Sequence, residues 1–196
     1  PTMSSTSFMS LACIASASTV PPRLITIALE APVNPRICKR STAEHVPAQE
    51  LSTPQVLSWT TAGGAIVHGL FYAPNTALFQ SPGRPPALIY IHGGPTSQAV
   101  ASFHPQTQFF TTRGYAVLHV NHRGSTGYGT VYVNALRGQW GVYDVEDAVS
   151  GAQYLVQQGW VEAQQLVIIG GSAGGYTVLQ ALVHHPGFFK AAICLY

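Results

Sequence analysis

Charged side chains are scarce in this sequence, since Asp, Glu, Lys and Arg make up only 8% of its 196 residues. Globular chains typically carry about 25%. The nine Lys and Arg residues are scattered and the net charge is +2, so no basic stripe or patch indicates binding to nucleic acid or to a membrane surface. A surface so poor in charge predicts that further chain or another subunit covers part of it. A homo-oligomer of the full-length form is one arrangement that would provide this cover.

Cysteine is also rare, with only Cys13, Cys38 and Cys194 at wide spacings. The sequence has neither a disulfide framework nor a metal-binding spacing, so we expect no metal and no cofactor. Thiols of this kind favour a reducing compartment, and we expect a cytoplasmic protein. No run of about 18 apolar residues predicts a membrane span, and the short apolar segment 8–15 lacks the preceding basic residues of a signal peptide.

The first 50 residues are rich in Ser, Thr, Ala and Pro and differ in composition from the rest of the chain. One strand is expected at residues 23–29, whereas residues 32–54 have the proline-containing pattern of a connector. We therefore divide the chain into residues 1–50 and a domain at residues 51–196. The sequence starts with proline and ends inside the apolar run 191–196, from which we expect a fragment.

From residue 54 onward, apolar strands alternate with helices, and Gly63-Gly64 predicts a hairpin turn. Continuous apolar runs predict strands buried on both faces, and the alternation predicts an α/β fold whose mostly parallel sheet has helices on both faces. The expected strands are 56–60, 66–72, 87–91, 115–120, 166–169 and 191–195, and the expected helices are 105–113, 142–158 and 174–184. One apolar stripe predicts the helix at 142–158 and comprises Val142, Val145, Val149, Ala152 and Val156.

Residues 170–174 read Gly-Gly-Ser-Ala-Gly and fit the pattern G-x-S-x-G, between an expected strand and an expected helix. This context is that of a nucleophile elbow, a tight turn that exposes a serine hydroxyl above the sheet. Ser172 is therefore the candidate nucleophile, and the Ala173 backbone N–H can face a developing oxyanion at the helix N-terminus. A glycine-rich turn without catalytic function is the alternative, because the pattern also arises by chance.

A second motif, His92-Gly93-Gly94-Pro95, follows the apolar strand at 87–91. Paired glycines let backbone N–H groups approach a ligand closely. In α/β-hydrolases, the loop after this strand supplies the other oxyanion donor. A plain Gly-Pro turn is the alternative, and we expect a structural role for His92 rather than that of a general base.

The third motif, residues 121–129, reads Asn-His-Arg-Gly-Ser-Thr-Gly-Tyr-Gly and follows the strand at 115–120. It lacks the glycine and lysine order of a phosphate-binding loop. We interpret it as a rigid loop beside the site, in which Arg123 and Tyr128 order the cleft.

Together, these motifs resemble the prolyl oligopeptidase family of serine peptidases, in particular its acylaminoacyl-peptidase and dipeptidyl-peptidase-like members. The resemblance covers residues 54–196, and its matching blocks are His92 to Pro95, Asn121 to Gly129, Trp140-Gly141 with Asp144 and Asp147, and Gly170 to Tyr176. It implies an α/β-hydrolase fold, incomplete at the C-terminus, and cleavage of short peptides by acyl transfer. It also implies Ser172 as nucleophile with Gly94 and Ala173 as oxyanion donors. Residues 1–50 resemble the last strands of the family's β-propeller.

The sequence departs from this pattern after Ser172. In this fold the three residues of the catalytic triad follow one another along the chain in the order Ser, Asp, His. However, no aspartate follows Ser172, and the only later histidines are His184 and His185. These close the helix that Ser172 opens, about 15 Å or more away at about 1.5 Å per residue. Asp144 and Asp147 lie on an earlier helix, where we expect structural contacts. We therefore expect the chain to lack its triad Asp and His, and to have no useful peptidase activity alone.

Two other functions stay open. An esterase or lipase of the same fold often has a third glycine where this chain has Pro95, and would lack the block 121–129. A non-catalytic or truncated product would fit the missing triad partners, although the intact elbow at 170–174 argues against long decay.

Overall fold

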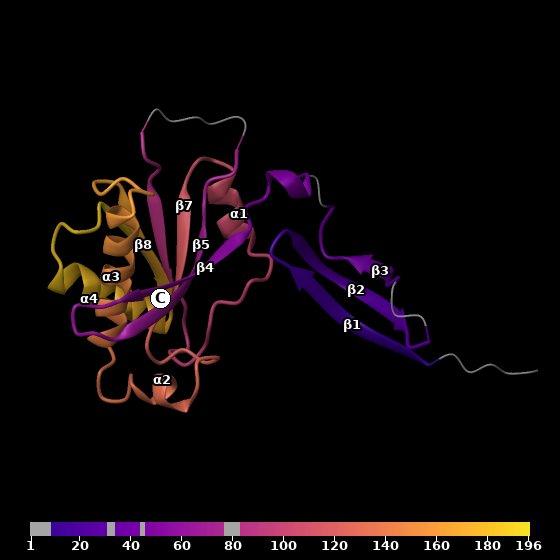
Figure 1. Cartoon of the computed structure of the whole chain (residues 1–196), viewed down its shortest axis with the longest axis horizontal. Coiled ribbons are helices and arrows are strands. Elements are labelled where there is room, and N and C mark those ends of the chain that lie inside the picture. Colours follow the sequence, from indigo (N-terminus) through magenta and orange to yellow (C-terminus); the bar gives the residue numbers. More distant parts are fainter. Residues whose placement is uncertain (1–8, 31–33, 44–45, 77–82) are drawn as a thin grey trace, which may run out of the picture.

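Two β-sheets lie side by side in the computed structural model, which describes residues 9–30, 34–43, 46–76 and 83–196 (Figure 1). The first sheet is antiparallel and consists of β1 (Ser10–Ala17), β2 (Val20–Ala28) and β3 (Arg36–Arg40). The strand expected at 23–29 corresponds to β2. Its two neighbours were not predicted, because β1 alternates only weakly in polarity and three of the five residues of β3 are basic.

The second sheet has six strands in the order β4-β5-β7-β6-β8-β9. The hairpin of β4 and β5 is antiparallel, as is the pairing of β5 with β7, whereas β7, β6, β8 and β9 are parallel. The mostly parallel α/β sheet predicted from the sequence is therefore confirmed. The strands are β4 (Pro54–Thr60), β5 (Ile66–Tyr72), β6 (Ala87–Ile91), β7 (Ala116–Asn121), β8 (Leu166–Gly171) and β9 (Ala191–Leu195).

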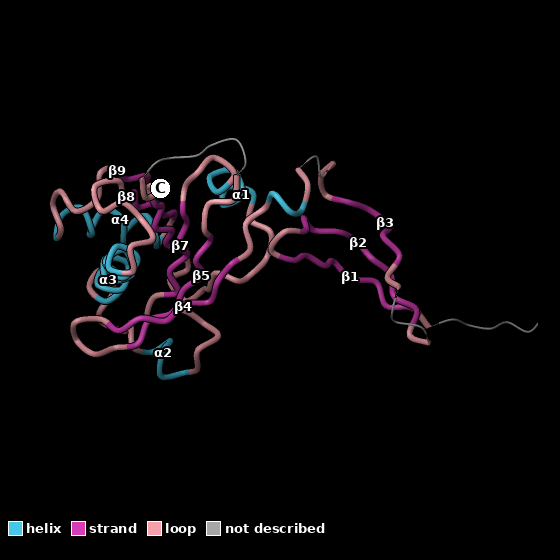
Figure 2. Tube along the Cα trace, turned by 45° about the horizontal axis from the view of Figure 1, so that its top comes forward, coloured by secondary structure: helices cyan, strands magenta, loops and turns pink. Residues whose placement is uncertain are grey.

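Helices cover both faces of this sheet (Figure 2). The helix α1 (Pro105–Thr111) lies on one face, and α3 (Tyr143–Gln157) and α4 (Ala173–His184) lie on the other. Two short elements, the 3₁₀ turn η1 (Ala48–Glu50) and α2 (Thr130–Asn134), were not predicted. The first lies in the expected connector, and the second is a single turn rich in β-branched residues, which have low helix propensity. Among the described residues, every helix is too short or too polar to cross a bilayer.

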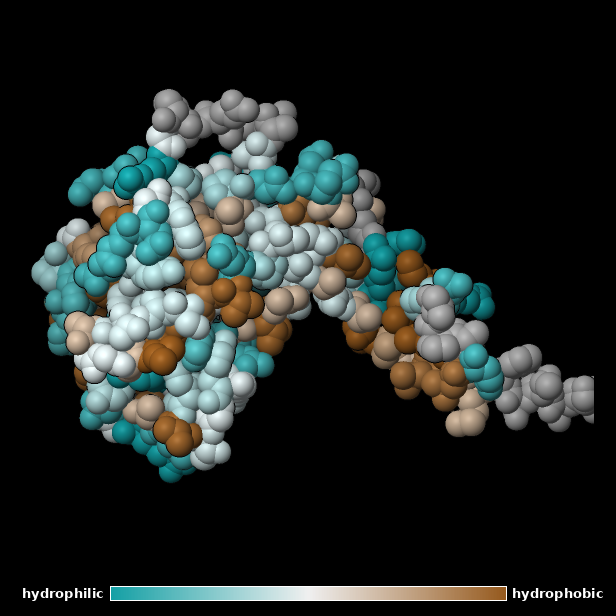
Figure 3. Space-filling view, viewed as in Figure 1, coloured by the Kyte–Doolittle hydropathy of each residue, from teal (hydrophilic) through white to brown (hydrophobic). Residues whose placement is uncertain are grey.

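The main core lies between the six-stranded sheet and α3 and α4. Strand β7 is buried along its whole length and β6 nearly so, which explains why their sequences are largely apolar, with His119 and Asn121 as the polar residues of β7. The stripe predicted for α3 is only partly correct: Val145, Val149 and Ala152 are buried, but Val142 precedes the helix and is exposed. Apolar side chains are exposed on β1 and β2 as well, including Leu11 and Ile14 (Figure 3).

Candidate active site

Ser172 occupies the turn between β8 and α4 in a conformation that L residues rarely adopt, with φ 55° and ψ −122°. Its glycine neighbours allow this turn. A Cβ atom at Gly170 would lie 2.4 Å from the Gly174 carbonyl oxygen, and one at Gly174 would lie 2.4 Å from the Ile91 carbonyl oxygen. Backbone atoms cannot yield at such distances, so the structure requires both glycines of the G-x-S-x-G pattern.

The helix that starts at Ala173 favours negative charge beside Ser172. The first N–H groups of a helix have no partner within it, and they carry the positive end of the helix dipole. The Ser172 N–H itself donates to the carbonyl oxygens of Leu195 at 2.9 Å and Tyr196 at 3.0 Å. The Ala173 N–H is the next donor along the chain, as the sequence predicts for an oxyanion site.

The His92-Gly93-Gly94-Pro95 loop lies against this turn because β6 and β8 are neighbours in register, with Ile91 opposite Gly170. A Cβ atom at Gly93 would lie 3.4 Å from the Ser172 Cβ and 4.0 Å from its Oγ. Gly94, with φ 132°, precedes a cis peptide bond to Pro95. The structure thus brings the predicted residues Gly94, Ala173 and Ser172 to one edge of the sheet.

His92 makes contacts that hold the loop rather than face a substrate. Its Nδ1 lies 2.8 Å from the Gly93 carbonyl oxygen, and its Nε2 lies 2.7 Å from the Ser125 Oγ. A carbonyl can only accept, so Nδ1 carries the proton and the neutral ring accepts the Ser125 hydroxyl at Nε2. Burial, reinforced by the neighbouring His122, lowers the pKa of His92 to about 4. The structural role expected for His92 agrees with these contacts.

A second buried histidine, His119, lies on β7 beside α1. Its Nε2 is 2.7 Å from the Thr107 Oγ1, which lies 3.0 Å from the His104 Nδ1. The Thr107 backbone N–H donates to the same His104 nitrogen, so the Thr107 hydroxyl can donate to His104 and accept from His119. Burial, followed by the nearby His104 and His92, lowers the pKa of His119 to about 3.

The low pKa values of these histidines predict that the protein loses stability in acid. His119 binds a proton below its ordinary pKa of 6.5 when unfolded, but only below about 3 when folded. The free energy of unfolding should therefore fall as the pH drops from 6.5 towards 3, by up to about 1.4 kcal/mol per pH unit for one such group. Urea unfolding between pH 7 and pH 4 measures the slope. The variant His119→Gln, which has no group that titrates there, should show a shallower slope, and equal slopes would contradict the prediction.

Arg123 anchors the third motif to α3. Its backbone N–H, Nε and Nη2 donate to Asp147 at 2.6 to 3.2 Å, and its Nη2 lies 2.7 Å from the Glu146 Oε2. Burial lowers the pKa of the Arg123 guanidinium, but the hydrogen bonds that it donates to Asp147 and Glu146 outweigh this effect and raise that pKa. Arg123 therefore stays charged. Its guanidinium also lies 4.0 Å from the centre of the Tyr143 ring, and the prediction that it orders this region is in line with these contacts.

Both aspartates of the sequence have structural contacts. Asp144 accepts the Gly141 N–H at 2.7 Å and a short hydrogen bond from the Thr177 hydroxyl, which ties α3 to α4. His184 and His185 lie at the far end of α4, a helix of 12 residues that is about 18 Å long. The contacts predicted for the aspartates and the distance predicted for the histidines agree with this arrangement.

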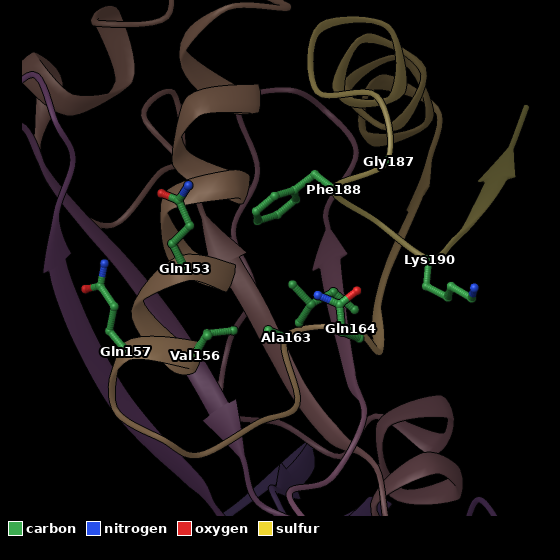
Figure 4. A pocket seen from close by; sticks show the side chains of 9 residues that line it. Gln153, Val156, Gln157, Ala163, Gln164, Gly187, Phe188 and Lys190 are labelled. Carbon is green, nitrogen blue, oxygen red and sulfur yellow. The ribbon is translucent and has the colours of Figure 1, made fainter.

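Two of the grooves formed by the described residues lie beside α3, away from Ser172. One, of about 490 Å³, is lined by α3 residues including Gln153 and by the segment around Phe188 (Figure 4). It reaches Leu166, the first residue of β8, whereas Ser172 follows the last, about 20 Å along the strand. The other, of about 440 Å³, lies between α3 and the end of α4. Within the described ranges, no group of three or more His, Cys, Asp or Glu side chains is arranged to hold a metal ion.

Buried polar residues connect the second and third motifs, and the sequence analysis did not predict them. Asn121 and Ser125 lie in the third motif, but their contacts reach back to residues 92 and 99. A polar residue at the end of a largely apolar strand, such as Asn121 after 116–120, is a signal that could have pointed to a buried partner.

Comparisons with known proteins identify the family. The model of the prolyl oligopeptidase family matches residues 101–196. Dipeptidyl aminopeptidase BIII of Pseudoxanthomonas mexicana is 38% identical over 108 residues, which are 55% of this chain and 16% of that protein. Acylamino-acid-releasing enzyme 1 of rice is 33% identical over 107 residues, which are 55% of this chain and 14% of that protein.

The solved structure of a puromycin-hydrolysing peptidase from Mycobacterium tuberculosis has the same fold, with a TM-score of 0.88 and 35% identity, over 93% of this chain and 28% of that chain. This chain thus spans less than a third of each of these proteins. The match of the family model and the agreement of sequence and fold lead to one conclusion: residues 101–196 match the prolyl oligopeptidase family, and the chain has the fold of part of the α/β-hydrolase domain of its members.

Proposed function

We propose that the chain carries the nucleophile and the oxyanion donors of a serine peptidase that cleaves short peptides by acyl transfer. The observation that carries this proposal is the conformation of Ser172, a non-glycine residue at φ 55° on the turn between β8 and α4. Backbone strain of this kind persists mainly at functional sites, where the surrounding structure maintains it. Gly93 lets the loop after β6 approach the serine closely, since a Cβ atom there would lie 3.4 Å from the Ser172 Cβ, and the start of α4 favours negative charge on a reacting carbonyl group.

In the proposed reaction, the Ser172 Oγ attacks the carbonyl carbon of the scissile amide while its proton passes to a base. The Gly94 and Ala173 N–H groups bind the oxyanion that forms, and each such donor contributes about 2.7–4 kcal/mol to the transition state. The C–N bond then breaks, the amine leaves with a proton, and water hydrolyses the acyl-enzyme. Because His184 and His185 are too far away to act as the base, the 196-residue chain alone should turn substrates over slowly.

The substrate class is inferred from the relatives. Their names describe a dipeptidyl aminopeptidase, an acylamino-acid-releasing enzyme and a puromycin-hydrolysing peptidase. We infer that this chain acts on amides of short peptides in the same way. We also propose that β1, β2 and β3 are the last strands of a β-propeller that restricts access to the site, and that the protein is cytoplasmic.

A chimaera tests the proposal. This chain replaces the matched segment of the Mycobacterium tuberculosis peptidase, which then supplies the rest of the hydrolase domain. We expect the chimaera to hydrolyse aminoacyl and acylaminoacyl anilides, and the 196-residue chain alone to hydrolyse them poorly. Release of the anilide chromophore measures both, and thermal unfolding shows that each protein is folded.

Two outcomes would contradict the proposal. A folded chimaera that hydrolyses short-chain esters but no anilides would indicate an esterase or lipase instead. A folded chimaera that hydrolyses neither would indicate a non-catalytic protein. Turnover of anilides by the isolated chain at the rate of the chimaera would overturn only the expectation that the chain is inactive alone.

A further inference from the structure

The loop after β6 is held in place by the loop after β7. The first, residues 92–99, contains the proposed oxyanion donor Gly94, and we name it the oxyanion loop. The second, residues 121–129, we name the clamp loop. We propose that Asn121 is a positioning residue that fixes the oxyanion loop relative to Ser172. This inference rests on the proposed function of Ser172.

Asn121 is the last residue of β7, and its side chain binds both backbone groups of Ala99. The Asn121 Oδ1 accepts the Ala99 N–H at 2.7 Å, and the Asn121 Nδ2 donates to the Ala99 carbonyl oxygen at 3.1 Å and to the Tyr128 hydroxyl at 2.9 Å. The residue is only 1% exposed. A carboxamide is needed here, because the side chain must accept and donate at the same time.

Further contacts join the two loops close to the oxyanion donor. The His92 Nε2 accepts the Ser125 hydroxyl at 2.7 Å, and the Thr126 N–H donates to the Ser97 carbonyl oxygen at 2.9 Å. The clamp loop therefore holds His92 at one end of the oxyanion loop and Ser97 and Ala99 at the other. Gly94 lies in the short span between these anchors, so its position depends on both ends.

The two loops also approach each other at Gly127. A Cβ atom there would lie 2.0 Å from the Gln98 Oε1, although the exposed Gln98 side chain can turn away. The need for glycine at this position comes from its φ of 91°, which L residues rarely adopt.

The clamp loop has a rigid support of its own. The Tyr128 ring is stacked on His68 of β5, with centres 4.2 Å apart and planes 1° apart, and the Tyr132 hydroxyl donates to the Asn121 carbonyl oxygen at 2.6 Å. The ion pair of Arg123 and Asp147 anchors the same loop to α3. Because the clamp loop is fixed independently, a change at the Asn121 side chain should loosen the oxyanion loop and leave the fold in place.

Such loosening matters for catalysis because an oxyanion donor works only when it is aimed in advance at the charge that develops. A displacement of about 1 Å can cost about a hundredfold in rate. Asn121 thus acts through Gly94, without contacting the substrate.

Hydrogen exchange of the 196-residue chain tests the inference. The reporter is the Thr126 amide, which bonds to Ser97 and which Asn121 does not touch. The variant Asn121→Asp keeps an acceptor for Ala99 but cannot donate to it, and we expect exchange at Thr126 to become about tenfold faster, the factor that corresponds to one hydrogen bond of ordinary strength. The amide of Leu118, in the buried centre of β7, should change by less than about twofold.

Two further variants serve as comparisons. Asn134→Asp makes the same chemical change at an exposed position at the end of α2 and should leave exchange at Thr126 unchanged. Asn121→Ala removes both side-chain hydrogen bonds to Ala99 without placing a charge in the buried position, and should speed exchange at Thr126 in the same direction, which keeps the test decisive if Asn121→Asp does not fold. Unchanged exchange at Thr126 in the folded variants, or an equal rise at Thr126 and Leu118, would overturn the inference.

The catalytic consequence is measured in the chimaera. Asn121→Asp should lower kcat about tenfold or more and leave KM within about twofold, because the donor serves the transition state more than the bound substrate. An equal loss of kcat/KM that comes from a higher KM would overturn the inference. If the unmutated chimaera is inactive, the proposed function fails, and the exchange data still decide whether Asn121 holds the loop.

Discussion

The substitution Ser172→Ala in the chimaera is expected to lower kcat for anilide hydrolysis by about 10⁶-fold, the scale measured when a nucleophilic serine is removed from an enzyme of this type. The substitution removes the Ser172 Oγ, the only atom at this turn that can form the acyl-enzyme. Binding and the oxyanion donors remain, so a residual rate of about 10³–10⁴ over water is expected. Because the change removes one oxygen, KM should stay nearly constant.

The control for this experiment is Ser41→Ala. Ser41 is an exposed serine after β3, and its backbone N–H, which donates to the Pro22 carbonyl oxygen, is retained in the variant. Turnover by this variant should equal that of the unmutated chimaera. A loss of less than about a hundredfold in Ser172→Ala, with the protein folded, would show that Ser172 is not the nucleophile. Labelling by a fluorophosphonate, lost only in Ser172→Ala, would give independent support.

The parts of the fold that the sequence predicted are those with a strong local pattern. The run at 87–91 is apolar throughout, and the run at 115–120 is apolar except for His119, because β6 and β7 are buried on both faces. The elbow around Ser172 was also predictable, since two glycines are needed where an added Cβ atom would lie 2.4 Å from a backbone oxygen. In contrast, β3 is short, exposed and basic, and its pairing with β2 cannot be read from its own residues.

The support of the site could not be predicted in the same way. Asn121 and Ala99 are 22 residues apart, and a contact between a side chain and a distant backbone has no periodic signal. The same holds for Ser125 and His92, which become neighbours only because β6 and β7 are adjacent and parallel. The sequence therefore indicates the reacting residues better than the residues that hold them.

The strongest effect on stability is expected at Asp147. Its carboxylate is fully buried and accepts hydrogen bonds from the backbone N–H, Nε and Nη2 of Arg123. In Asp147→Asn, one oxygen becomes an amide group that donates, and it faces donors of Arg123. The guanidinium would remain charged and largely buried with only the half-exposed Glu146 as an anionic partner, and loss of a buried partner typically costs about 3–5 kcal/mol. Urea unfolding at pH 7 measures the loss.

Glu146→Gln is the matched control for Asp147→Asn, because Glu146 binds the same Arg123 Nη2 at 2.7 Å but its side chain is 35% exposed. Water screens this pair, so its loss should cost about 1 kcal/mol or less. The difference between the two variants isolates the effect of burial, since both remove one negative charge near the same cation. Equal losses would contradict the assignment of Asp147 as the anchor. A large loss only in Asp147→Asn would mean that the clamp loop, and through it the proposed oxyanion loop, depends on one buried carboxylate of α3.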